Sequence, residues 1–132
     1  MKTELLHDIA TEADVKRLVD AFYEKVNADK LLSPVFNEAA AVHWAHHLPV
    51  MYTFWSSILL GTASYHGRPF PKHLSLPIGR EHFDRWLQLF TGTVDALFEG
   101  DKAEEAKMRS YSIAQVFQYR LGLLAEGNGG ME

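Results

Sequence analysis

The stretch Phe70-Pro71-Lys72-His73-Leu74-Ser75-Leu76-Pro77 decides the fold, because two predicted helices precede it and two follow it. Its first proline suits the first position of a short helix, and its last proline ends that helix soon after. The stretch lies in a glycine- and proline-rich connection, residues 61–79. A connection of this length in a compact domain is usually functional or mobile. We therefore expect His73 to lie on a short helical turn within a functional loop.

The two helices before this loop are predicted from apolar residues at helical spacing. The first covers about residues 11–28, and Thr11 with Asp14 forms its capping pair. Its buried stripe is predicted to be Val15, Leu18, Val19, Phe22, Tyr23 and Val26. Short helical turns follow at 31–37, and the second helix covers about 41–60. Pro49 removes a backbone donor there, so this helix either kinks at Pro49 or begins only near His47.

The two helices after the loop are predicted at about 80–98 and from Asp101 onward. In the last helix the expected core residues are Ile113, Val116, Phe117, Leu121 and Leu124. No segment has a convincing strand pattern, so the predicted fold class is all-α. We expect one domain over residues 1–132, with flexible tails at 1–10 and 126–132.

The composition excludes several classes of protein. The net charge of −4 and a pI near 5.9 give no reason to expect nucleic acid as a partner. The chain has no cysteine, which excludes disulfides, iron–sulfur clusters and thiol chemistry. No apolar run is long enough for a membrane span, and the first residues are too polar for a signal peptide. We therefore expect a cytoplasmic protein, and the seven histidines suggest a metal or a cofactor.

Two histidines in apolar surroundings suggest which cofactor. His73 is one, and the other is His47, in the aromatic run 46–55. A haem iron takes one protein ligand on one side of its plane, most often histidine, and a polar group on the other side. Alternatively, His73 is a solvated loop residue, and His47 lies on the helix surface like His46. His43, His46 and His47 together could also hold a non-haem metal.

Two further side chains carry a polar donor on an apolar body, namely Tyr23 and Trp86. Their O–H and N–H groups would stabilise a bound dioxygen, which carries negative charge, more than neutral carbon monoxide. Both residues could equally be core aromatics. Phe36 and Phe54 are core residues on the first interpretation and a wall of a flat cofactor on the second.

At these residues the chain resembles the truncated haemoglobins, specifically their group III. The matching segments span roughly residues 13–122. They are Phe22-Tyr23-Glu24-Lys25-Val26, Leu32-Ser33-Pro34-Val35-Phe36-Asn37, His47 to Gly61, Lys72-His73-Leu74-Ser75-Leu76-Pro77 and His82-Phe83-Asp84-Arg85-Trp86-Leu87-Gln88-Leu89-Phe90. The resemblance implies a globin-like, truncated two-over-two helical sandwich that forms a single domain around haem b.

The resemblance also implies roles for individual residues. It makes His73 the iron ligand, and it makes His47, Tyr23 and Trp86 the residues that contact the gas. The apolar contacts to the haem are expected from Phe36, Met51, Phe54 and Leu76. The nearest cations for the haem propionates are Arg68, Lys72 and Arg80.

The expected ligands are dioxygen, nitric oxide and carbon monoxide. Roles in oxygen transport or handling, nitric oxide dioxygenation or peroxidase-like chemistry fit the family, with an unidentified reductase as a partner in the redox roles. Two alternatives stay open at this point, namely a non-haem metalloprotein and a cofactor-free helical interaction module. The sequence leaves the oligomeric state open.

Overall fold

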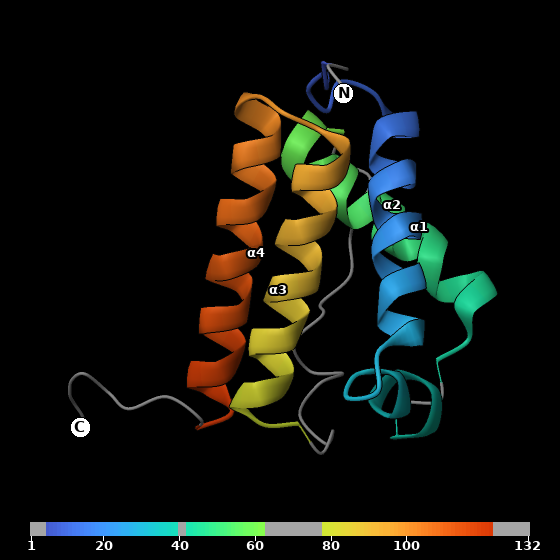
Figure 1. Ribbon diagram of the computed structural model, residues 1–132, viewed down its shortest axis with the longest axis vertical. Helices are drawn as coiled ribbons and strands as arrows, with labels where there is room; N and C mark the ends of the chain where they lie inside the picture. The colour runs from blue at the N-terminus through green and yellow to red at the C-terminus, as the bar shows by residue number, and fades with distance from the viewer. Residues whose placement is uncertain (1–4, 40–41, 63–77, 123–132) are drawn as a thin grey trace.

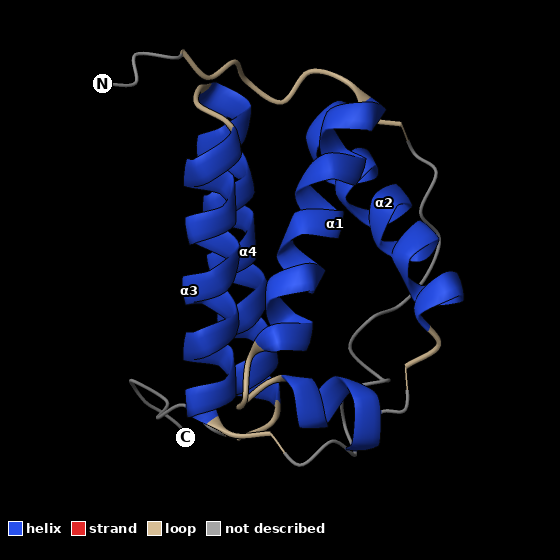
Figure 2. Cartoon of the chain, turned by 45° about the vertical axis from the view of Figure 1, so that its right-hand side comes forward, coloured by secondary structure: helices blue, strands red, loops and turns tan. Residues whose placement is uncertain are grey.

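Four helices in two pairs form the part of the chain that the computed structural model describes, residues 5–39, 42–62 and 78–122. The elements are α1 (Glu12–Ala28), a short π-helix η1 (Val35–Ala39), α2 (Trp44–Leu60), α3 (Arg80–Leu97) and α4 (Asp101–Arg120). These residues contain no strand, so the all-α prediction is confirmed. The helices α3 and α4 lie side by side, and α1 packs between this pair and α2 (Figures 1 and 2).

The first helix agrees with its prediction in both its start and its buried face. The Thr11 hydroxyl accepts a hydrogen bond from the Asp14 amide at 3.1 Å, and the Asp14 carboxylate accepts one from the Thr11 amide, also at 3.1 Å. This reciprocal pair is the predicted capping box. The buried residues are the six that were expected. The stripe is apolar except for the Tyr23 hydroxyl.

The second helix begins at Trp44 and continues through Pro49, so the alternative start near His47 is wrong. Pro49 is exposed, and the carbonyl of Ala45 is the one left without its usual helical donor. The helix ends at Gly61, whose φ of 68° is a left-handed conformation that suits glycine. Before this helix, the helical turns predicted at 31–37 are confirmed, although the π-helix extends them to residue 39.

The fourth helix buries a different face from the predicted one. Its buried residues are small or polar: Ala103, Ala106, Ser110, Ala114 and Gln118. Val116, which was predicted to be in the core, is 51% exposed, while Ile113, Phe117 and Leu121 are half-buried. Leu124 lies outside the described residues. Small side chains let the axes of α3 and α4 approach closely, and hydrophobicity alone does not reveal such a face.

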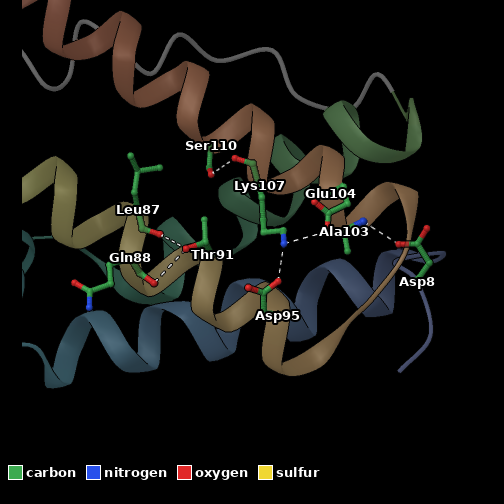
Figure 3. A network of polar contacts seen from close by, with 9 residues as sticks. All are labelled: Asp8, Leu87, Gln88, Thr91, Asp95, Ala103, Glu104, Lys107 and Ser110. Atoms are coloured by element: carbon green, nitrogen blue, oxygen red, sulfur yellow. Dashed lines mark hydrogen bonds and ion pairs between the residues drawn. The ribbon is translucent and has the colours of Figure 1, made fainter. Parts of the chain in front are cut away.

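Polar contacts between and along α3 and α4 surround this small-residue face (Figure 3). The Lys107 ammonium lies 2.7 Å from the Asp95 carboxylate of α3 and 3.0 Å from Glu104 of its own helix. The Ser110 hydroxyl donates to the Lys107 carbonyl at 2.7 Å, which satisfies a buried polar group within the helix.

Asp8 caps α4 from a distant part of the sequence (Figure 3). Its carboxylate accepts hydrogen bonds from the backbone amides of Lys102 at 2.9 Å and Ala103 at 2.8 Å. Gly100, with a φ of 143°, leaves room for this carboxylate, since a Cβ there would lie 2.5 Å from Asp8. Ile9 is buried beside it. Residues 5–10, part of the segment predicted to be a tail, thus contact the helices.

None of the described helices combines the length and the apolar character that a membrane crossing requires.

Candidate functional site

Four aromatic rings from three elements meet where the end of α1 faces the start of α2. We call them the pocket cluster: Tyr23 from α1, Phe36 from η1, and Trp44 and His47 from α2. The Tyr23 ring centroid lies 5.3 Å from both His47 and Trp44, and 5.8 Å from Phe36. Trp44 also stacks on Phe36 at 5.9 Å and meets the edge of His47 at 5.5 Å.

The pocket cluster brings two polar groups into this aromatic environment. Tyr23 is 6% exposed, and burial raises the pKa of its hydroxyl well above the ordinary value. The hydroxyl therefore stays protonated and remains a hydrogen-bond donor at any ordinary pH. The Nε2 atom of His47 is buried, whereas the neighbouring His46 is exposed. His47 thus faces inward, which decides between its two predicted orientations.

Local hydrogen bonds explain why the first turn of α2 presents His47 to Tyr23. The His43 carbonyl accepts from the amides of His46 at 3.0 Å and His47 at 2.8 Å, which starts the helix. The Val42 amide donates to the Phe36 carbonyl at 2.8 Å and fixes this start against η1. Because Trp44 and His47 are three residues apart, their side chains lie on the same helical face.

Trp44 is a site residue that the sequence interpretation did not identify. Its indole Nε1 donates to the Asn37 amide oxygen at 2.7 Å. The Asn37 amide nitrogen in turn donates to the Asn27 side chain at 2.7 Å and to the Ser33 carbonyl at 3.1 Å. The helical spacing to His47 was the available signal.

Trp86 belongs to a second group of rings, which we call the core stack: Phe22, Trp55, Trp86 and Phe90. Phe90 stacks on Trp86 with ring centroids 5.6 Å apart and on Trp55 at 4.8 Å, with interplanar angles of 7° and 19°. Phe22 meets the edge of Trp86 at 5.6 Å. Phe22 also contacts Tyr23 at 4.8 Å, so one ring separates Trp86 from the pocket cluster.

The remaining predicted residues fall into three sets. Met51 and Phe54 are half-buried and pack against the core, and Phe54 also meets Trp55 at 5.4 Å. Arg80 is exposed at the first position of α3. The predictions for His73, Arg68, Lys72 and Leu76 lie outside the described residues.

The alternative of a non-haem metal at His43, His46 and His47 is not supported. Within residues 5–39, 42–62 and 78–122, no three side chains of histidine, aspartate or glutamate are grouped as metal ligands would be. His43 and His46 are exposed, while His47 turns toward the aromatic rings. His43 is the N-cap residue of α2, and His46 and His47 are neighbours in the chain, so their side chains point in different directions.

Comparisons with known proteins agree with this architecture. The sequence model of a family described as bacterial-like globin matches residues 4–117. The chain is 35% identical over 114 residues to the group 3 truncated hemoglobin of Campylobacter jejuni, covering 83% of this chain and 90% of that protein. The crystal structure of group III truncated hemoglobin from Campylobacter jejuni matches with a TM-score of 0.78 at 33% identity. That match covers 99% of this chain and 100% of the crystallised chain.

Proposed function

Because the chain belongs to the bacterial-like globins, as a group III truncated haemoglobin, we propose that it holds haem b and binds dioxygen and other diatomic gases. The observation that carries the proposal is the pairing of Tyr23 with His47 inside the aromatic pocket cluster. A mostly apolar site with a few converging polar groups is typical of cofactor and small-ligand sites.

The described residues of this region fit a haem. A flat, apolar cofactor needs aromatic and aliphatic contacts, which Phe36, Met51 and Phe54 can provide. The buried Nε2 of His47 and the protonated hydroxyl of Tyr23 add two polar groups to these apolar surroundings, as a site for a polar gas ligand requires. We further propose His73 as the iron ligand, Leu76 as an apolar contact, and Arg68, Lys72 and Arg80 as partners of the propionates.

When bound, the haem supplies the iron that takes up the gas, and the chain supplies the donors. The Tyr23 hydroxyl can donate a hydrogen bond to a ligand that carries negative charge, and a ring N–H of His47 is the second proposed donor. Trp86 is the proposed third donor. Hydrogen bonds to charged groups are stronger than neutral ones, so these donors should stabilise bound dioxygen more than bound carbon monoxide.

A firmly held dioxygen favours slow release over rapid transport. The same donors would polarise an O–O bond, so the proposal includes redox reactions of the gas, such as nitric oxide dioxygenation or peroxidase-like turnover. Repeated turnover of either reaction would consume electrons, and we propose that a reductase supplies them. We place this chemistry in the cytoplasm.

The proposal is tested by titrating purified protein with haemin and recording its absorption spectrum. The parent should give a sharp Soret band, whereas His73→Ala should lose stable haem retention. His46→Ala is the matched control, because His46 is exposed and should not affect binding. Unchanged haem affinity and an unchanged ferrous spectrum in His73→Ala would contradict the assignment of the iron ligand.

A further inference from the structure

The indole of Trp44 makes ring contacts on one side and a side-chain hydrogen bond on the other. On the inner side its ring contacts Tyr23 at 5.3 Å and His47 at 5.5 Å. On the outer side its Nε1 donates to Asn37, whose own amide nitrogen donates to Asn27 and Ser33. The Trp44 ring therefore lies between Tyr23 with His47, which we call the polar pair, and a chain of side-chain hydrogen bonds.

This chain of hydrogen bonds lies on the exposed side of the pocket cluster. Tyr23 is buried, Trp44 is half-buried and Asn37 is exposed, so the three residues form a line from the interior to the solvent. Because the Trp44 ring contacts both Tyr23 and His47, a movement of the ring would change the space beside them. Asn37 determines the position of the ring, because it is fixed in turn to the end of α1 and to the turn before η1.

We propose that Trp44 controls the access of gas to Tyr23 and His47, and that Asn37 acts as the positioning residue that holds Trp44 in place. The inference rests on the proposed function, since it concerns the ligand of that site. Gas reaches the polar pair when the indole moves away, and breaking its hydrogen bond to Asn37 makes that movement more frequent. Loss of the bond thus changes the rate of entry more than the strength of the polar contacts.

The test measures carbon monoxide association after flash photolysis of the ferrous, haem-loaded protein. Asn37→Ala removes the acceptor, and Trp44→Phe removes the donor but keeps an aromatic ring on Phe36. Each should speed association on the order of twofold to tenfold, the change in population that one hydrogen bond supports. The double variant should be no faster than Trp44→Phe, because both changes remove the same interaction.

A matched control separates this effect from general loosening of the turn. Arg85 pairs with Asp29 at 2.5 Å, and Asp29 in turn accepts from the amides of Leu31 and Leu32 just before η1. Arg85→Ala should weaken the same part of the chain without contacting Trp44. Its carbon monoxide association should equal that of the parent, and an increase as large as in Asn37→Ala would overturn the proposal.

A second readout does not depend on gas binding. The chain has three tryptophans, so the Trp44 indole N–H resonance is the one that disappears in Trp44→Phe. In Asn37→Ala this resonance should shift and exchange faster with solvent. If it does so while association stays at the parental rate in both variants, Trp44 does not control access. A parent without a Soret band would instead refute the proposed function itself, and the inference with it.

Discussion

The pocket cluster and the core stack each contain four aromatic rings, yet they differ in what surrounds them. In the core stack, Trp55 and Trp86 lie nearly parallel to Phe90, which is fully buried, and Phe22 meets Phe90 edge-on. The pocket cluster places Tyr23 and His47 at an interplanar angle of 80°, and it contains the Tyr23 hydroxyl and the buried Nε2 of His47. The groups meet at the neighbouring residues Phe22 and Tyr23 of α1. One position along a helix thus separates a residue of the core from a residue of the candidate site.

The largest effect is expected from a substitution that disrupts the core stack. Phe90→Ala removes a ring that contacts Phe22, Trp55 and Trp86, and it leaves a cavity among them. We expect a loss of about 3–5 kcal/mol in the free energy of unfolding, measured by chemical denaturation. A loss below about 1 kcal/mol would show that the stack is not the centre of the core.

The next effect acts on the pocket cluster alone. Tyr23→Phe keeps the ring and removes the hydroxyl, so oxygen dissociation should speed up about tenfold or more, as expected for a hydrogen bond to a charged group. Stopped-flow mixing measures this rate. In the parent the rate should not respond to pH near 10, the ordinary pKa of tyrosine, because burial raises the pKa of Tyr23 above it. A rate equal to the parent in Tyr23→Phe would remove the hydroxyl from the site.

Trp86→Phe tests whether Trp86 acts on the gas together with the pocket cluster or only packs in the core stack. The replacement keeps a ring against Phe22 and Phe90 but removes the indole donor. We expect faster oxygen dissociation than in the parent, by a smaller factor than in Tyr23→Phe, because Trp86 lies one ring away from Tyr23. If the unfolding free energy falls while the dissociation rate stays parental, Trp86 belongs to the core stack only.

The smallest effect comes from a site remote from both ring groups. Asp8→Ala removes the cap of α4 and should cost about 1 kcal/mol in unfolding free energy, with parental gas kinetics. Partial burial raises the pKa of Asp8, but hydrogen bonds from the amides of Lys102, Ala103 and Ile9 outweigh it, and the net shift is downward.

A lowered pKa gives this prediction its pH dependence. The stabilisation by Asp8 is present above the unfolded-state pKa of about 4 and is lost as the pH falls through the lower folded-state value. The difference between parent and Asp8→Ala should therefore close below about pH 4. A difference that persists in strong acid would mean that the charge of Asp8 is not what stabilises α4.

The sequence predicts where the helices lie along the chain better than it predicts which side of each helix is buried. The stripe of α1 is readable because large apolar residues recur at helical spacing. In α4 the same reasoning selects Val116, which is exposed, because the buried side consists of Ala103, Ala106 and Ala114. Their burial follows from close packing on α3, a property of the partner helix that the local pattern does not contain. The cap of α4 by Asp8 is equally non-local.

The candidate site was predictable only in part, because some of its contacts are also non-local. Tyr23 and His47 were each predicted as site residues by residue type, the resemblance grouped them with Trp86, and the structure brings the first two together. The role of Trp44 depends on Asn37, seven residues earlier, and on the course of the chain between them. Helical spacing places Trp44 on the same face as His47, but it gives no sign of the hydrogen bond to Asn37.

The most direct test of the account is the absorption spectrum of the purified chain with haemin, recorded ferric, then reduced, then under carbon monoxide. We expect a sharp Soret band that shifts on reduction and shifts again with the gas, as for a histidine-ligated iron that is open to a ligand. Features of free haemin alone would contradict it, and the pocket cluster would then be the core of a cofactor-free helical protein.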